Sequence, residues 1–426
     1  MPRRSAVVSA LGAAILALPL LAACSSSSPD DSADGGDGVE YGATKAEYQE
    51  AFADIDPIEL QVQTGGTEGA PANQPREAYM EAVTEWSDGK ITFDIAYGNG
   101  IVASPIEVDD ALSDGRLDLS FSLLLSSEPD FYPVNSVFAD LSFLGKTGVI
   151  GPLAASSWML EALYEQEAFQ QEAEDAGFIL LVPDPPALVN TAQLTCRDGA
   201  VSSLDDAAGL LVSVNGAAKQ AQAEALGMTP VSMPWNEEYE ALQRGIIDCS
   251  MQSMSALQAG GLVDVAQFET FDSEVSIAST VTNFGFSLEV WDSLPLVARQ
   301  LLFDRLDVYL STSYTLGLTA WKAGTDVMLA GGGDLVDFDD EARDAINGVS
   351  DDLLVDVADR GLDIDVDELV DSAGRWQGVV ADALDFSGMS AKEFVEEYST
   401  EQIEQLDTSA IWERLYEDVL LDHRPS

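Results

Sequence analysis

The side chains that usually perform acid–base or covalent chemistry are either almost absent from this sequence or too common to single out a site. Its only histidine is His423, and 75 of its 426 residues are aspartate or glutamate. A serine–histidine–aspartate triad, a cysteine–histidine pair and a histidine-ligated zinc ion therefore have no place in the body of the chain. Pairs of carboxylates are uninformative at this abundance, and no glycine-rich phosphate loop occurs. These residues favour a protein that is not an enzyme and that uses no metal or cofactor.

One stretch of alternating acids is similar to a calcium-binding loop but lacks two of its defining residues. Asp363, Asp365 and Asp367 have the spacing of the first ligands in an EF-hand loop. Glu368 stands where that loop needs glycine, and Gly374 stands where it needs a glutamate that binds the ion through both oxygens. We therefore interpret this stretch as a solvated loop that caps a helix.

The first residues have the pattern of an export signal. Arg3 and Arg4 precede an apolar run that ends at Cys24, with small residues before its end. The run has about the minimum length for a bilayer span and no basic flank follows it, so a transmembrane helix is the weaker interpretation. The segment from Leu21 to Cys24, "LAAC", is similar to the lipobox of bacterial lipoproteins, in which the cysteine is lipidated. We expect residues 1–23 to be a signal peptide and Cys24 to anchor the exported protein to the outer face of the cell membrane.

The segment after the signal peptide and the overall charge describe an exposed, acidic protein. Serine, aspartate and glycine dominate the residues after Cys24 and cannot form a core, so we expect residues 24–52 to be a flexible tether. The net charge is −56 at pH 7, with only 19 lysine and arginine residues. Such a surface repels nucleic acid and anionic lipid head groups, which argues against phosphate-rich partners, and we expect no nucleic-acid partner. Because the acids are spread along the chain, we attribute them to salty surroundings rather than to a cationic partner.

Two ten-residue stretches are similar to each other: "ALSDGRLDLS" at 111–120 and "ALQRGIIDCS" at 241–250. In each, an apolar helix end precedes a glycine that reverses the chain and the apolar residues of a strand. Alternating apolar residues predict strands at 58–64 and 91–97 before the first copy, and the order strand–helix–strand–helix–strand repeats over 210–251. This order predicts two α/β lobes, each with a mostly parallel sheet. The alternative is a chance likeness between two common helix–glycine–strand joints.

The two predicted lobes suggest where a ligand binds. In open α/β sheets, ligands lie beyond the carboxyl ends of the strands. Two such lobes facing each other place Ser120 and Ser122 opposite Ser250 and Gln252 across a cleft. An exported, two-lobed chain without catalytic residues indicates a binding protein rather than an enzyme.

The stretch from Asp205 to Ser250 resembles the solute-binding proteins of TRAP (tripartite ATP-independent periplasmic) transporters. That family has an Asp-x-x-Gly strand, a helix that ends with glycine, and the patterns Pro-x-x-Glu-x-Tyr-x-Ala-Leu-x-x-Gly-x-x-Asp and Trp-x-x-Leu-Pro. The matching residues are Asp206, Gly209, Gly227, Pro234, Glu237 or Glu238, Tyr239, Ala241, Leu242, Gly245, Asp248, Trp291, Leu294 and Pro295. Together with the N-terminal half, the resemblance spans roughly residues 58–330.

The resemblance implies an α/β, two-lobed fold of the periplasmic-binding-protein type II kind, with two mostly parallel sheets, crossover helices and a ligand cleft between the lobes. It assigns residues 53–190 to lobe I, residues 191–285 to lobe II, and residues 286–426 to a return to lobe I that ends in an acidic helical region. Residues 293–330 hold an apolar helical period and are expected to form a long helix that bridges the lobes. A pair of helices broken near Gly317 is the alternative.

The cysteines other than Cys24 are Cys196 and Cys249. The resemblance places them on neighbouring segments that cross between the lobes, and disulfides persist in exported proteins, so we expect them to pair. Two buried free thiols are the alternative.

The sequence departs from the family at a position that contacts the ligand. Ser213 stands where the family has an arginine that binds a ligand carboxylate. Either another cation replaces that arginine or the solute is neutral or cationic; we favour the second, because a buried carboxylate without a counter-charge is unfavourable. The candidate substitute cations are Arg76, Arg197 and Lys219, and the candidate ligand contacts are Ser120, Ser122, Ser213, Asn215, Trp235, Asn236, Gln252 and Phe286.

Together these features predict a lipid-anchored extracytoplasmic receptor that captures a small solute and delivers it to a TRAP membrane permease. An ABC-type substrate-binding lipoprotein is the nearest alternative, because two lobes and a lipobox serve both systems. A secreted carboxylate-dependent hydrolase is the alternative from another class, and it requires two carboxyl groups about 5 to 9 Å apart across the cleft.

Overall fold

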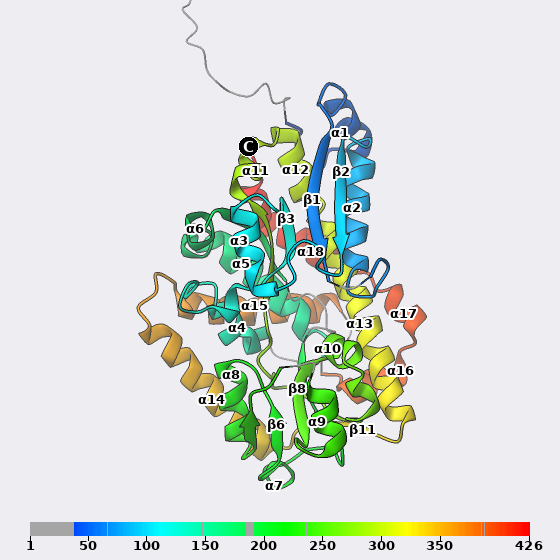
Figure 1. Ribbon diagram of the computed structural model, residues 1–426, viewed down its shortest axis with the longest axis vertical. Coiled ribbons are helices and arrows are strands. Elements are labelled where there is room, and N and C mark those ends of the chain that lie inside the picture. The colour runs from blue at the N-terminus through cyan, green and yellow to red at the C-terminus, as the bar shows by residue number, and fades with distance from the viewer. Residues whose placement is uncertain are drawn as a thin grey trace, which may run out of the picture. The chain divides into compact units, whose positions relative to one another are not determined.

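The computed structural model describes residues 38–65, 67–145, 148–184, 191–234, 237–384, 386 and 388–426. Two sheets form the centres of two lobes, drawn one above the other in Figure 1. The predicted signal peptide, Cys24 and the ligand candidates Trp235 and Asn236 lie outside the described residues. Within the described ranges, no helix combines the length and the apolar character that a membrane span needs.

The sheet of lobe I contains five strands. They are β1 (Ile58–Thr64), β2 (Ile91–Tyr97), β3 (Leu119–Leu123), β4 (Phe178–Asp184) and β10 (Thr282–Ser287). Their spatial order is β2-β1-β3-β10-β4. β1 runs parallel to β2 and β3, whereas β10 is antiparallel to β3 and β4. The predicted strands at 58–64 and 91–97 are confirmed by β1 and β2.

The sheet of lobe II contains six strands. They are β5 (Ala192–Cys196), β6 (Leu211–Ser213), β7 (Thr229–Val231), β8 (Cys249–Ser253), β9 (Phe268–Thr270) and β11 (Asp334–Val336). From one edge the order is β7-β6-β8-β5-β9-β11, with β6 parallel to β7 and β8 and with β5 antiparallel to β8 and β9. Both sheets therefore place three parallel strands beside one antiparallel strand, and the predicted two-lobed α/β class is confirmed.

The two similar ten-residue stretches lead into β3 and β8, which hold equivalent places in the two sheets. In each copy a glycine with positive φ follows the helix, and the aspartate then binds the backbone of the neighbouring strand. Asp118 Oδ2 accepts a hydrogen bond from the Gln61 N–H at 2.6 Å, and Asp248 Oδ2 accepts one from the Leu211 N–H at 2.9 Å. The two stretches therefore occupy equivalent places in the two sheets and make equivalent contacts.

Helices flank both sheets (Figure 1). Lobe I contains α1 (Lys45–Ala51), α2 (Gln74–Trp86), α3 (Val108–Ser113), α4 (Val137–Asp140), α5 (Gly151–Glu165), α6 (Glu167–Asp175), α11 (Leu288–Ser293) and α12 (Leu296–Asp304). Lobe II contains α7 (Leu204–Ala207), α8 (Ala217–Ala225), α9 (Glu238–Arg244) and α10 (Met254–Ala259).

Helix α1 lies in the segment that the composition assigned to the tether. It begins with a capping box between Thr44 and Glu47, and Tyr48 and Phe52 are buried in the core of lobe I. The expected tether over 24–52 is therefore wrong at its C-terminal end, because two aromatic side chains within it pack against the lobe.

The expected bridging helix is present but shorter than the apolar period. α13 (Leu306–Ala330) has 25 residues, which gives a length of about 37 Å. It is separated from α12 at Arg305, so the expected single helix is broken, but not near Gly317 as the alternative had it, because Gly317 is buried inside α13. α13 packs on α2 in lobe I and on α10, β9 and β11 in lobe II. It therefore bridges the lobes.

The C-terminal region packs on both lobes. It contains α14 (Asp340–Asp359), α15 (Val366–Ala383), α16 (Ala391–Glu397), α17 (Thr400–Glu404) and α18 (Ser409–Asp418). α14 packs on α8 of lobe II, and α15 packs on α5 of lobe I, where Trp376 Nε1 donates a hydrogen bond to Glu161 at 2.5 Å. Residues 286–426 were expected to return to lobe I. This expectation is incomplete, because β11 and α14 lie within this range and belong to lobe II.

Candidate functional site

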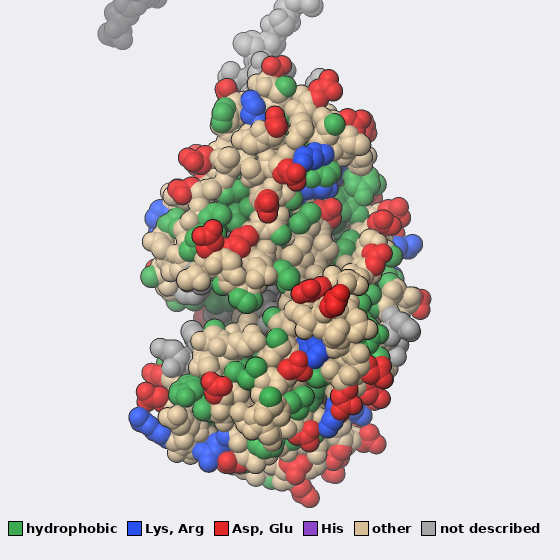
Figure 2. Space-filling model, turned by 90° about the vertical axis from the view of Figure 1, so that its right-hand side faces the viewer, with side chains coloured by type: hydrophobic (Ala, Val, Ile, Leu, Met, Phe, Trp, Pro, Cys, Tyr) green, Lys and Arg blue, Asp and Glu red, His purple; other side chains and the backbone are tan. Residues whose placement is uncertain are grey.

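A pocket of about 540 Å³ lies between the lobes. We call it the interlobe pocket; its lining residues are Ser126, Pro129, Pro133, Ser136, Ala139, Asp140, Asn215, Gly216, Ala217, Ala218, Lys219, Ala278, Ser279, Thr280 and Arg360. Ser126 follows β3 and Asn215 follows β6, so the pocket lies beyond the carboxyl ends of both strands. Figure 2, which shows another side of the molecule, has a hollow between the upper and lower halves of the surface.

Three of the predicted polar residues of lobe II converge on a carboxylate instead of lining the interlobe pocket. Glu238 is fully buried. Its carboxylate accepts hydrogen bonds from Ser213 Oγ at 2.9 Å, Ser250 Oγ at 2.7 Å and Gln252 Nε2 at 2.8 Å. Only Asn215, of the predicted contacts in lobe II that the structure describes, lines the pocket. The family pattern left its glutamate open between Glu237 and Glu238, and nothing local indicated that Glu238 is buried.

The predicted residues of lobe I lie on and beside β3. Ser120 is fully buried, and its Oγ accepts a hydrogen bond from the Ser122 N–H at 3.1 Å. The guanidinium carbon of Arg76, in α2, lies 5.8 Å from the centre of the Phe121 ring, within the range of a cation–π contact. These side chains are not among those that line the interlobe pocket.

Two further candidates lie at the wrong end of their sheets. Phe286 is fully buried, with its ring 5.3 Å from that of Trp291, and pairs with Leu119 at the amino end of β3. Arg197 follows β5, whose last residue pairs with Cys249 at the amino end of β8. Both were expected at the cleft; they lie away from it because β5 and β10 run antiparallel to the strands whose carboxyl ends form the pocket.

Two cations line the interlobe pocket. Lys219 is 5% exposed; burial lowers the pKa of its ammonium to about 8, and the carboxylate of Glu238 opposes this shift. Arg360 follows α14 and forms ion pairs with Asp140 at 2.7 Å and Asp356 at 2.9 Å. Lys219 was a predicted substitute cation, whereas Arg360 lies beyond the part of the sequence with a recognisable pattern and was missed.

Cys196 and Cys249 form a disulfide, with an S–S distance of 2.05 Å. They are directly opposed residues of the antiparallel strands β5 and β8. The bond therefore joins the strand that enters from the other lobe to a central strand, at the end of the sheet away from the interlobe pocket.

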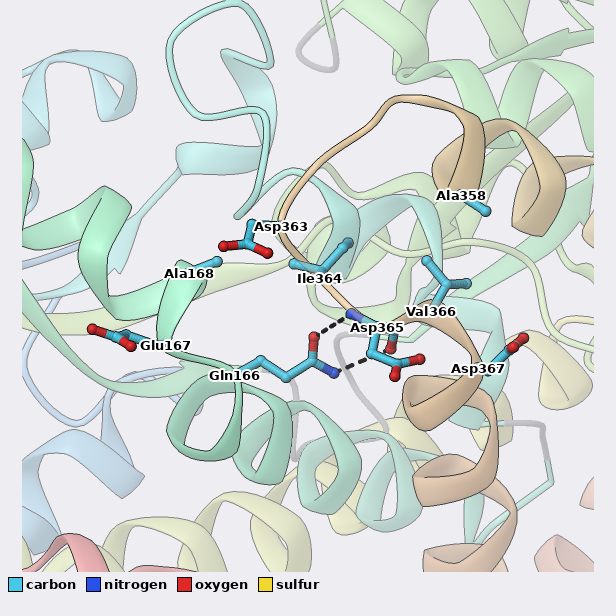
Figure 3. Close-up of a pocket in the computed structure, with 9 residues that line it drawn as sticks. All are labelled: Gln166, Glu167, Ala168, Ala358, Asp363, Ile364, Asp365, Val366 and Asp367. Atoms are coloured by element: carbon cyan, nitrogen blue, oxygen red, sulfur yellow. Dashed lines mark hydrogen bonds between the residues drawn. The ribbon is translucent and has the colours of Figure 1, made fainter.

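A second pocket, also of about 540 Å³, lies on lobe I and includes the calcium-like stretch (Figure 3). Two of its lining residues are joined: Gln166 accepts a hydrogen bond from the Asp365 N–H at 2.7 Å and donates one to the Asp365 carbonyl at 3.2 Å. Asp365 Oδ1 also accepts from the Glu368 N–H at 3.1 Å and caps α15. The helix-capping interpretation is confirmed, and within the described ranges no group of histidine, cysteine, aspartate and glutamate side chains is arranged to hold a metal ion.

Comparison with known proteins identifies the fold. The family model for the bacterial extracellular solute-binding proteins, family 7, matches residues 65–356 of this chain. The match ends inside α14. A TRAP periplasmic solute-binding protein from Ochrobactrum anthropi has a TM-score of 0.62 and 20% identity, covering 76% of this chain and 97% of its own. One from Marinobacter aquaeolei VT8 has a TM-score of 0.61 and 20% identity, covering 74% and 99%. One from Desulfovibrio desulfuricans, with bound sn-glycerol-3-phosphate, has a TM-score of 0.60 and 12% identity, covering 75% and 97%.

Proposed function

The chain belongs to family 7 of the bacterial extracellular solute-binding proteins, and on this basis we propose that it is the receptor of a TRAP-type transport system. It captures a small solute between its lobes and delivers the solute to a membrane permease. The family consists of solute-binding receptors and not of enzymes, so the hydrolase alternative is rejected. The likeness to TRAP receptors supports this system over an ABC-type one.

The interlobe pocket is the observation that carries the proposal. Its walls come from lobe I, lobe II and the segment from Ala278 to Thr280 that connects them. A solute in this position contacts both lobes at once, so its binding favours the arrangement in which the lobes are closed. Closure around a ligand is the signal by which a receptor of this architecture can present a loaded state to a partner.

The lining of the interlobe pocket bears on the charge of the solute. The expectation of a neutral or cationic solute rested on Ser213 replacing an arginine. Lys219 lines the pocket, so the pocket has a cation without that arginine. The related receptor from Desulfovibrio desulfuricans was solved with an anion. Both points favour an anionic solute.

Attachment to the membrane is the second part of the proposal. Lipidation of Cys24 with two or more acyl chains is sufficient for stable anchoring. The chain then enters the folded body at lobe I, where the Val39 N–H donates a hydrogen bond to Gln300 Oε1 at 2.7 Å. Lobe I is therefore the half of the receptor that is joined to the anchor.

Solute capture is tested on the mature chain, residues 25–426, by a thermal-shift screen of acids, polyols, amides and amines. A ligand at 100 times its dissociation constant adds about 2.7 kcal/mol of stability. The best ligand is then offered to proteoliposomes that contain the permease encoded with the receptor. Uptake that needs the receptor and no ATP supports the proposal, whereas ATP-dependent uptake or the absence of any ligand contradicts it.

Anchoring is tested by fractionating cells that express the wild-type chain or Cys24→Ser. The wild-type protein should be in the membrane fraction at the processed mass, and Cys24→Ser should be shed or left unprocessed. Ser25→Ala is the matched control and should behave like the wild-type protein. A Cys24→Ser protein that remains in the membrane at the processed mass contradicts lipid anchoring.

A further inference from the structure

The first turn of α8 faces the interlobe pocket. The residues from Gly216 to Lys219 all line it. Gly216 is the N-cap residue and makes no side-chain cap, and the first helical hydrogen bond runs from the Gln220 N–H to the Gly216 carbonyl at 3.2 Å. The N–H groups of a first helical turn have no acceptor within the helix and carry the positive end of its dipole. This end of α8 therefore offers hydrogen-bond donors to the pocket.

The ammonium of Lys219 adds a full positive charge beside these donors. Its side chain is 5% exposed and lines the pocket, and within the described ranges it makes no hydrogen bond or ion pair. A buried charge without hydrogen-bond partners is strongly unfavourable. Its isolation leaves all three N–H donors of the ammonium for a molecule in the pocket.

The charged groups Glu238 and Arg360, which lie near Lys219, already have hydrogen-bond or ion-pair partners of their own. Glu238 attracts Lys219, but its carboxylate oxygens accept hydrogen bonds from three neutral side chains of lobe II. The second cation of the pocket, Arg360, is ion-paired with Asp140, the acid that lines the pocket from lobe I. β7, which also packs on α8, contains no titratable residue; α14, the other helix packed on α8, carries several acids, of which Asp356 is ion-paired with Arg360. Of the two cations that line the pocket, Lys219 is therefore the one whose N–H donors are available to a ligand.

We propose that the first turn of α8 and the ammonium of Lys219 form an oxyanion site that holds the acidic group of the solute. The proposal rests on the proposed receptor function and names the chemistry of its ligand: a small molecule with a carboxylate, phosphate or sulfonate group. The counter-charge has moved from the strand position of Ser213 to the start of the following helix.

The geometry of the site also limits how selective it is. An arginine fork matches a planar carboxylate through two parallel hydrogen bonds, whereas an ammonium is a compact point charge. Backbone N–H groups at a helix start accept carboxylate and phosphate oxygens alike. The site therefore distinguishes an oxyanion from a neutral group by charge alone. The other residues of the pocket must recognise the part of the solute outside its acidic group.

The experiment measures binding by calorimetry with pairs of probes that differ in the acidic group. Suitable pairs are glycerol 3-phosphate and glycerol, glucuronate and glucose, benzoate and benzamide, and ethanesulfonate and ethanol. At least one acid should bind at pH 7 and its neutral partner should not. The pairs also show which acidic group the site prefers.

Three variants identify Lys219 as the group responsible. Lys219→Met should weaken binding of the acid by about 30-fold or more, the range found when one partner of a buried charge pair is removed. Lys219→Arg should retain binding. Lys322→Met is the matched control, because Lys322 is a buried lysine that is paired with Asp326 and does not line the pocket; its affinity for the acid should be unchanged.

A pH profile separates a direct charge contact from a structural role. Affinity of the wild-type protein should fall by about 30-fold between pH 7 and pH 9.5, because Lys219 loses its proton with a pKa of about 8. Lys219→Arg should show no such fall, since arginine stays charged.

The outcomes distinguish the oxyanion site from the receptor function. Tight binding of a neutral probe alone, or binding of an acid that Lys219→Met leaves unchanged, overturns the oxyanion site and leaves the receptor function standing. Absence of binding by every probe, whatever its charge, counts against the receptor function and the site together.

Discussion

The guanidinium of Arg424 and the carboxylate of Asp304 lie against each other inside lobe I, with Nε to Oδ1 at 2.9 Å and Nη2 to Oδ2 at 3.0 Å. Asp304 also accepts hydrogen bonds from the hydroxyls of Tyr48 at 2.5 Å and Tyr416 at 2.7 Å. Arg424 donates in addition to the carbonyl of Val39 at 2.8 Å. The pair thus holds together the first described residues, the end of α12 and the C-terminal region.

Removal of Arg424 should destabilise the protein strongly. The two side chains are 9% and 6% exposed, and Arg424→Met leaves Asp304 buried without its counter-charge, at a cost of about 3 to 5 kcal/mol. Arg414→Met removes an exposed pair with Asp418 and should cost less than about 1 kcal/mol. The free energy of unfolding in urea measures both. Equal losses in the two variants refute the structural role of the buried pair.

The two aspartates of the repeated stretch should contribute alike. Asp118→Ala and Asp248→Ala each leave one strand N–H without its carboxylate acceptor, at a cost of about 1 kcal/mol. Asp114→Ala, which removes an exposed ion pair with Arg116, is the control and should cost less. Urea denaturation again provides the measurement. A cost in only one of the two lobes contradicts their equivalence.

The disulfide should account for a large share of the stability of the protein. Cys196 and Cys249 are 53 residues apart in sequence, and closing a loop of this size contributes roughly 4 kcal/mol in the chain-entropy model. The double variant Cys196→Ala/Cys249→Ala should lose about that amount. Thiol titration of the unfolded mature chain, residues 25–426, should detect no thiol before reduction and two thiols after it. Two thiols before reduction contradict the pairing.

Glu269 should make the protein less stable as the pH rises from 4.5 to 7. Burial raises the pKa of its carboxyl to about 7, although hydrogen bonds from Thr325 and Trp321 oppose the shift. Between the unfolded pKa of 4.5 and the folded pKa of about 7, the folded state binds more protons, so stability declines across this window by about 3 kcal/mol.

Glu269→Gln should flatten this part of the pH profile, measured by urea denaturation between pH 4.5 and pH 8. Glu289→Gln, at an exposed position, is the control and should leave the profile unchanged. A wild-type profile that rises over the window, or one that Glu269→Gln does not alter, is inconsistent with a buried carboxyl of raised pKa.

Local patterns in the sequence were sufficient to predict the first two strands and the presence of two similar lobes. The strands at 58–64 and 91–97 were predicted to the residue, because alternation of apolar side chains depends only on neighbouring residues. The two copies of helix, glycine and strand were equally readable, and they occupy equivalent places. The family resemblance added the expectation that one long helix bridges the two lobes.

The direction of the crossing strands could not be predicted from the same patterns. β5 and β10 enter their sheets from the opposite lobe, and alternation is identical for either direction of a strand. Phe286 and Arg197 were therefore assigned to the cleft although their strands carry them to the far end. Lys219 became distinguishable from Arg76 and Arg197 only when the structure showed which of the three lines the interlobe pocket.

The entry of the chain at Val39, on lobe I, has a consequence for the meeting of receptor and permease. Residues 25–37 can span at most about 45 Å when fully extended. Under the proposed lipidation of Cys24, lobe I would stay within this radius of a point on the membrane, and the receptor would search a small volume that moves in two dimensions. For a permease within that radius, the proposed anchoring would set an effective receptor concentration in the millimolar range. The affinity of the receptor for a neighbouring permease can then be low. A low affinity lets the empty receptor dissociate quickly after it has delivered its solute.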